Sequence, residues 1–235
     1  MRANSGVLSG RHAVTRNSFG FAVCGLMFFA LMLAVSSVHA GDIAELQVTE
    51  NQGIYSMKMV MLVDAPARYV RDVLTDYTHI YRLNPTITES YVLPSPKQGV
   101  TRVKTVISGC VAFFCRDVGR VEDISEQGTG SLLAVIVPEL SDLRSGIAEW
   151  DIQSTGNQTR VVYQASMEPD FFVPPLVGPF VIKENIRSEL LASFNRIECI
   201  TQIRQQFRTP GHQQMATSRP AACDEHAEDD IKPLL

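Results

Sequence analysis

The sequence contains few of the residues, and none of the motifs, on which common catalytic and metal sites depend. It has no G-x-S-x-G turn, no H-E-x-x-H pattern and no C-x-x-C pair, and GTG at 128–130 lacks the rest of a phosphate-binding loop. Of its five histidines only His79, His212 and His226 follow residue 40, and their spacing is not that of metal ligands. We therefore expect neither a metal nor a cofactor.

Positive charge is also scarce. The chain has 21 Lys and Arg residues against 25 Asp and Glu residues, and residues 1–40 hold three of the arginines and no acid. Residues 41–235 therefore carry 18 basic and 25 acidic side chains, a net charge of −7. Such a surface repels phosphate backbones. We expect no nucleic-acid partner.

The first 40 residues follow the order of a secretory signal. A basic start precedes the apolar run Phe19–Val35, and small residues at Val38 and Ala40 precede Gly41. We predict cleavage after Ala40, with export across an inner membrane into a Gram-negative periplasm. The alternative is that the apolar run, about 17 residues long, remains as a membrane anchor at the lower limit of a spanning helix.

Four cysteines follow the predicted cleavage site, an even number that suits disulfides in an oxidising compartment. Cys110 and Cys115 flank four residues, a spacing that facing positions of a hairpin can bridge; the alternative is two buried thiols. A bond between Cys199 and Cys223 is the less favoured one, because it would tie down a weakly structured tail.

Beyond residue 53 the pattern predicts a strand, two short helices, six further strands and a long helix. In the first strand Met57 and Met59 alternate with polar residues, so they face inward. The strands are expected at 55–63, 88–95, 99–108, 113–124, 130–140, 146–153 and 159–168, the short helices at 64–77 and 78–87, and the amphipathic long helix at 183–206.

Alternation along the strands predicts which side chains face inward. Trp150 and Tyr163 fall on the inner face. In CRDVGRVED at 115–123, placing Arg116 and Arg120 outside turns Asp117 inward. An inward carboxylate needs hydrogen bonds or water. Asp117 therefore marks either a solvated cavity or a bulge that breaks this register.

The order of elements resembles the helix-grip fold of the START-like or SRPBCC superfamily, which is polyketide cyclase/dehydrase-like. The resemblance rests on VMLVDAPARYVRDVLTDY, on SGIAEWDIQ followed by TRVVYQASMEP, and on the Pro-rich segment before IRSELLASFNRIE. It implies an α+β fold in which a curved antiparallel sheet of about seven strands wraps a long C-terminal helix. The expected domain is 54–206, between an N-terminal extension at 41–53 and a disordered acidic tail at 207–235.

The resemblance further implies an apolar cavity between sheet and helix, and it supplies no shared catalytic motif. The first hypothesis is an exported, non-catalytic binder or carrier of a hydrophobic small molecule or lipid. The second is a cyclase- or hydrolase-like enzyme with Asp117 as base and Tyr163 or His79 as acid, and the third is an interaction module with a filled core. Residues expected to line the cavity are Met57, Met59, Trp150, Tyr163, Phe171, Phe172 and Phe194.

The segment EPDFFVPPLVGPFVIKENI at 168–186 joins the last strand to the long helix and is rich in proline and phenylalanine. Its prolines cannot donate ladder hydrogen bonds, which predicts a stiff loop at the cavity mouth. One interpretation is that Phe171, Phe172, Leu176 and Phe180 plug the end of the sheet. The other is that they form a transient contact with a membrane or a ligand.

Overall fold

The computed structural model describes residues 41–95, 97–111, 114–128, 130–174, 178–208 and 223, all within one compact unit at 39–235. The predicted signal at 1–40 lies outside the described residues. Of the predicted tail at 207–235, only residues 207, 208 and 223 are described.

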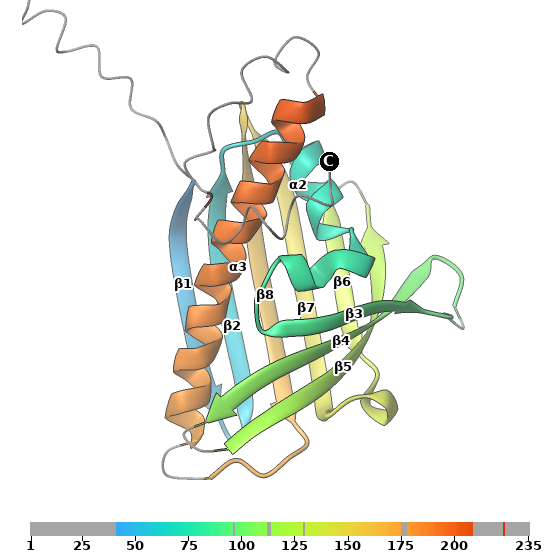
Figure 1. Cartoon of the computed structure of the whole chain (residues 1–235), viewed down its shortest axis with the longest axis vertical. Helices are drawn as coiled ribbons and strands as arrows, with labels where there is room; N and C mark the ends of the chain where they lie inside the picture. Colours follow the sequence, from blue (N-terminus) through green and yellow to red (C-terminus); the bar gives the residue numbers. More distant parts are fainter. Residues whose placement is uncertain are drawn as a thin grey trace, which may run out of the picture. The chain divides into compact units, whose positions relative to one another are not determined.

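In the described residues, eight strands form one antiparallel sheet in the order β1-β2-β8-β7-β6-β5-β4-β3, which curves around a long C-terminal helix (Figure 1). The elements are β1 (Asp42–Asn51), β2 (Ile54–Val63), α2 (Ala67–Leu74), η1 (Tyr77–Arg82), β3 (Ile87–Leu93), β4 (Val100–Val111), β5 (Phe114–Gln127), β6 (Ser131–Ile136), η2 (Pro138–Leu140), β7 (Leu143–Thr155), β8 (Gln158–Pro169) and α3 (Gly178–Arg208). The predicted α+β helix-grip architecture is confirmed.

The strand count differs from the prediction because residues 41–53 belong to the sheet. Strand β1 pairs with β2 along its length, and the two are joined by a tight turn at Gln52 and Gly53, both with positive φ. Ile43 and Leu46 of β1 pack against the core. Polar residues and an irregularity after Ile43 interrupt the alternation of this edge strand, which hides it in the sequence.

Helix α3 begins at Gly178, five residues before the predicted start. Pro179 is compatible with this position because the first turn of a helix needs no intrahelical N–H donor there. The loop predicted for residues 168–186 is correspondingly shorter.

The register predicted for β5 is wrong. Thr105 of β4 pairs with Arg120, and Val103 pairs with Glu122, so Arg120 and Glu122 share the inner face and Asp117 lies on the outer one, exposed to solvent. The prediction placed Arg120 and Glu122 outside because both are charged. They can face inward because their charges are opposite and pair with each other. Val121, only 2% exposed, is buried on the face opposite Glu122.

The packed core occupies one end of the space between sheet and helix. The C-terminal half of α3 contributes Phe194, Ile197 and Ile200, which lie against β2, β6, β7, β8 and α2. The buried partners from these elements are Met59, Met61, Val63, Val70, Val73, Leu132, Ile152 and Val161. The N-terminal half of α3 lies beyond this core and covers a cavity instead.

Both pairs of cysteines form disulfides. Cys110 and Cys115 are directly paired across β4 and β5, as predicted from their spacing. The less favoured bond between Cys199 and Cys223 is also present. Cys199 is 1% exposed in α3 and Cys223 packs against the core, so this bond fixes a residue beyond the end of α3 to the domain.

Candidate functional site

A cavity of about 750 Å³ lies between the inner face of the sheet and the N-terminal half of α3. This volume falls in the usual range for small-molecule sites. The side chains along its wall are mostly apolar, and they include Met57, Met59, Met61, Ile80, Ile107, Val118, Ile124, Leu132, Ile136, Trp150, Tyr163, Met167, Ile182, Ile186 and Leu190. A void of this size is not the filled core of the third hypothesis.

Six of the seven residues predicted to line the cavity do so: Met57, Met59, Trp150, Tyr163, Phe171 and Phe172. The prediction was wrong for the seventh residue, Phe194. It is 4% exposed, belongs to the packed core and does not line the cavity. Ser193, beside it, does line the cavity.

An ion pair lies in the apolar wall. The Nε of Arg120 lies 3.1 Å from Oε2 of Glu122 and donates a 3.2 Å hydrogen bond to Oγ1 of Thr105. The side chains of Arg120 and Glu122 are 24% and 9% exposed. Each charge is stabilised by the other, which makes their desolvation tolerable. The Nη atoms of Arg120 have no hydrogen-bond partner among the described residues and remain available as donors.

Tyr163 adds a neutral donor to this polar spot. Its ring packs against Trp150 at 5.0 Å between centroids, and its hydroxyl lies 4.0 Å from Sδ of Met57, a weak acceptor. Burial raises the pKa of Tyr163 to about 12; the negative charge of Glu122 acts in the same direction and Arg120 opposes it. The phenol therefore stays protonated at neutral pH and can donate to a ligand.

A second polar group on the cavity wall ties α3 to the segment before β3. The amide of Asn84 donates to Oγ of Ser193 at 2.9 Å and to the carbonyl of Glu189 at 3.1 Å. Thr86 donates to the Glu189 carboxylate at 3.0 Å. Because these groups satisfy one another, the network positions α3 over the cavity.

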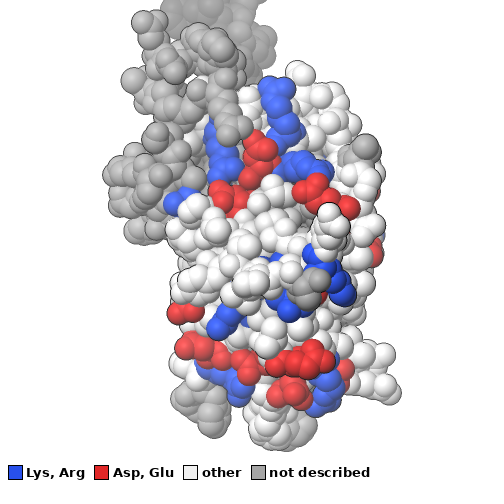
Figure 2. All heavy atoms as spheres, turned by 90° about the vertical axis from the view of Figure 1, so that its right-hand side faces the viewer, with Lys and Arg blue, Asp and Glu red and all other residues white. Residues whose placement is uncertain are grey.

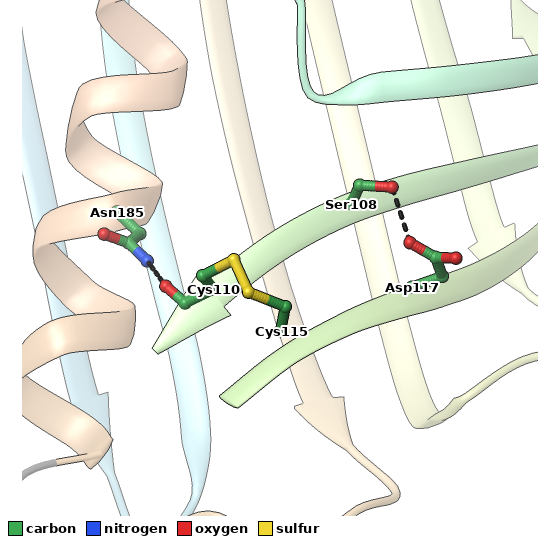
Figure 3. Close-up of a disulfide and its surroundings, with 5 residues drawn as sticks. All are labelled: Ser108, Cys110, Cys115, Asp117 and Asn185. Atoms are coloured by element: carbon green, nitrogen blue, oxygen red, sulfur yellow. Dashed lines mark hydrogen bonds between the residues drawn. A yellow bond between two sulfur atoms is a disulfide. The ribbon is translucent and has the colours of Figure 1, made fainter. Parts of the chain in front are cut away.

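At the mouth of the cavity, the β4–β5 hairpin faces the start of α3. The amide of Asn185 donates to the carbonyl of Cys110 at 3.2 Å, beside the disulfide to Cys115 (Figure 3). The guanidinium of Arg116 lies 4.8 Å from the ring centre of Phe171. These contacts join the hairpin to α3 and to the segment that follows β8.

Phe171 and Phe172 line the cavity, and Phe180 lies in the first turn of α3; these three phenylalanines are called the aromatic lip below. Phe171 is half-buried, whereas Phe172 is 83% and Phe180 64% exposed. Nζ of Lys183 lies 5.9 Å from the ring centre of Phe180. Exposure of this degree means that Phe172 and Phe180 do not plug the sheet; Leu176 lies outside the described residues.

No protein-family model matches the chain, and no curated protein sequence matches it. Among solved structures, the Zhui aromatase/cyclase from Streptomyces sp. R1128 is 16% identical, with a TM-score of 0.50 over 67% of this chain and 98% of that one. The chain has the START-like helix-grip fold. A START superfamily protein from Mycobacterium smegmatis (14% identity, TM-score 0.49, 61% and 97% covered) and human STARD10 (13%, 0.49, 90% and 89%) are further matches.

In this START-like domain the three candidate acid–base residues are not brought together. Asp117 lies on the outer face, where it accepts a 2.5 Å hydrogen bond from Ser108 (Figure 3). His79 lies on η1, 2.7 Å from Asp76, and does not line the cavity. Only Tyr163 faces the cavity, so the cyclase- or hydrolase-like hypothesis loses its base.

Several charged side chains elsewhere on the START-like domain form ion pairs. Figure 2 shows basic and acidic side chains lying beside one another over one face, with uncharged residues between them. Arg102 and Asp123 form a two-pronged pair at 2.7 and 2.9 Å, and hydrogen bonding by Arg102 holds the pKa of Asp123 below its usual value.

The described part has no cluster of three or more His, Cys, Asp or Glu that could hold a metal ion. Nor is any of its helices long and apolar enough to cross a membrane.

The residues that sequence reasoning missed are the inward charged ones, Arg120 and Glu122. The signal that could have found them is opposite charge at i and i+2 on a strand, flanked on the same face by Val118 and Ile124. Two opposite charges that share a face can be placed inward as a pair, although one alone cannot.

Proposed function

We propose that the chain is an exported, non-catalytic binder or carrier that holds one hydrophobic small molecule or lipid in the cavity between its sheet and α3. The observation that carries this proposal is a mostly apolar cavity of about 750 Å³ whose wall contains the ion pair of Arg120 and Glu122. Burying roughly 300 Å² of apolar ligand surface contributes on the order of 7 kcal/mol before ordering costs, enough for binding without a charged anchor.

The polar groups in the cavity wall restrict the class of ligand that fits. Arg120 and Tyr163 offer donors, and Glu122 cancels the charge of Arg120. A ligand with an apolar body and a single hydrogen-bond acceptor, such as a carbonyl or hydroxyl group, therefore fits better than one with several charges. A fully ionised headgroup would have to compete with Glu122 for Arg120, whereas a fatty acid can bind with its carboxyl group protonated and its carbonyl oxygen as the acceptor.

The aromatic lip is the proposed site of ligand exchange and of transient membrane contact. Phe172 and Phe180 expose apolar rings, and Lys183 and Arg116 lie beside aromatic rings of the lip. Because residues 41–235 carry a net charge of −7, contact by ring insertion is favoured over general electrostatic attraction to an anionic surface.

The test is native mass spectrometry of the exported protein, followed by uptake of cis-parinaric acid, a fluorescent fatty acid. Ala165 lines the cavity opposite Met57, so Ala165→Trp fills it and is expected to reduce uptake at least tenfold. Val135→Trp, at a 42% exposed position on β6, is the matched control and should leave uptake unchanged. A protein that carries no ligand and takes up none, or equal uptake by both variants, would refute the proposal.

A further inference from the structure

The carboxylate of Glu198 is buried in the middle of α3 and lies against the first described residue of the chain. Glu198 is 2% exposed, and its Oε1 accepts a hydrogen bond from the backbone N–H of Gly41. Gly41 immediately precedes β1, the edge strand next to β2. This contact joins two segments that are 157 positions apart in the sequence.

Glu198 has hydrogen bonds but no countercharge among the residues that the structure describes. Its other partners in the described part are the backbone N–H of Asp64 and Nε2 of Gln202 at 3.3 Å, and neither is a cation. Burial raises the pKa of Glu198; the hydrogen bonds from Gly41 and Asp64 act against this, and the charge of Asp64 adds to it. A buried carboxylate without a cation is costly, and structures keep one only where something compensates it.

The backbone at residue 41 fits closely against this carboxylate. A Cβ atom at Gly41 would lie 2.5 Å from the carbonyl oxygen of Leu62, and it would also overlap the Glu198 carboxyl group. This close approach of the backbone to Leu62 and Glu198 requires glycine here. The site admits a main-chain nitrogen and excludes any side chain.

The sequence independently predicts cleavage between Ala40 and Gly41, the bond that carries this nitrogen. Hydrolysis of the bond by a signal peptidase consumes one water, leaves a carboxylate on Ala40 and converts the amide nitrogen of Gly41 into an ammonium group. The ammonium group has three hydrogen-bond donors and a positive charge, whereas the backbone amide has one donor and no charge. Cleavage at any other bond would not place the charge at residue 41.

We propose that the Ala40–Gly41 bond is a maturation site whose cleavage supplies the missing countercharge, so that the new α-ammonium of Gly41 forms a buried ion pair with Glu198. The pair locks edge strand β1 to α3. It rests on the proposed export but not on what the cavity binds, because neither residue lines the cavity. Processing then stabilises the exported form relative to its precursor.

The first experiment locates the cleavage. The full chain is expressed with its own leader in a Gram-negative host, and the intact mass of the exported protein is measured. The mass expected is that of a chain that begins at Gly41. A chain that begins at another residue, or that keeps its leader, would overturn the proposal while leaving the cavity proposal untouched.

The second experiment measures coupling between the amine and the carboxylate in a chain with both disulfides formed. Proteins that begin at Gly41, or that carry a Ser-Ala extension before it, are compared with and without Glu198→Gln. The free amine should raise the melting temperature by about 2–4 °C when Glu198 is present, and by less than about 1 °C in Glu198→Gln, from the scaling for domains of 150–250 residues. Equal shifts in both backgrounds would overturn the proposal.

Controls separate the pair from general charge effects. Asp42 is an exposed carboxylate next to Gly41, so Asp42→Asn should leave the effect of the free amine unchanged. If Glu198→Gln does not fold, ¹⁵N-glycine labelling allows the α-amine of Gly41 to be titrated by NMR in the unmodified protein. Ion pairing should raise its pKa above the ordinary value of about 8, whereas an ordinary value would overturn the proposal.

Discussion

The ion pair in the cavity wall makes a sharp prediction about stability. Glu122→Leu leaves the charge of Arg120 uncompensated in an apolar wall. Breaking a buried pair in this way costs about 3–5 kcal/mol, but Arg120 keeps some exposure to the cavity, so we expect about 2–3 kcal/mol. For a domain of this size that corresponds to a fall of about 5–10 °C in melting temperature.

The double variant Arg120→Leu with Glu122→Leu should recover most of this loss, because it replaces the pair by apolar side chains and leaves no charge behind. Urea unfolding of the wild type, both single variants and the double variant gives the coupling energy directly. The matched control is the more accessible pair of Lys58 and Glu45, 2.9 Å apart with side chains 43% and 31% exposed, for which less than about 1 kcal/mol is expected.

Binding measurements distinguish the role of this ion pair in ligand binding from its contribution to the stability of the protein. The double variant should still bind diphenylhexatriene, a wholly apolar dye, with little change, but it should lose at least tenfold in affinity for cis-parinaric acid relative to that dye. Additive losses in the double variant, or an unchanged ratio of the two affinities, would refute the assignment of Arg120 and Glu122 as a paired anchor inside the cavity.

Two further predictions concern the aromatic lip and the acid stability of the domain. Phe172→Asp should slow transfer of cis-parinaric acid from lipid vesicles severalfold with no change in melting temperature, whereas Leu140→Asp, at a 53% exposed position on η2, should not; equal rates would exclude membrane contact by the lip. Burial opposes ionisation of Asp76, but hydrogen bonds from His79 and Arg204 outweigh it and hold the pKa of Asp76 below its usual value. Its stabilisation is therefore complete above the ordinary carboxyl pKa of about 3.9 and is lost as pH falls through the lower folded value, so urea unfolding between pH 5 and 2 should show a smaller acid-induced loss for Asp76→Asn than for the wild type.

The sequence predicted those parts of the fold in which local pattern and packing agree. Alternation placed Met57, Trp150 and Tyr163 on the inner face because these strands have one apolar and one polar side. The spacing of Cys110 and Cys115 predicted their bond because both lie on one hairpin. Local information was sufficient in each case.

The predictions failed where the deciding contact is not expressed in the alternation of polar and apolar residues. Alternation could not show that Arg120 faces Glu122 inside a cavity, because the energy that allows two inward charges comes from their pairing. The bond from Cys199 to Cys223 was less favoured because no local pattern orders the chain around Cys223. Strand β1 was placed outside the domain because its stabilising partners, β2 and α3, come later in the sequence.

The contacts of α3 are unevenly distributed, and this distribution indicates where the cavity opens. Its C-terminal half is fixed by the packed core, by the disulfide of Cys199 and by the contact of Glu198 with Gly41. Its N-terminal half covers the cavity, and it is joined to the rest of the domain by the hydrogen bond from Asn185 to β4 and by the bonds between Glu189 and the segment before β3. Opening a segment costs least where few apolar contacts are lost. The start of α3 should therefore separate from the β4–β5 hairpin first. The proposed ligand exchange would then take place at the aromatic lip, and the contact between Glu198 and Gly41 would remain intact.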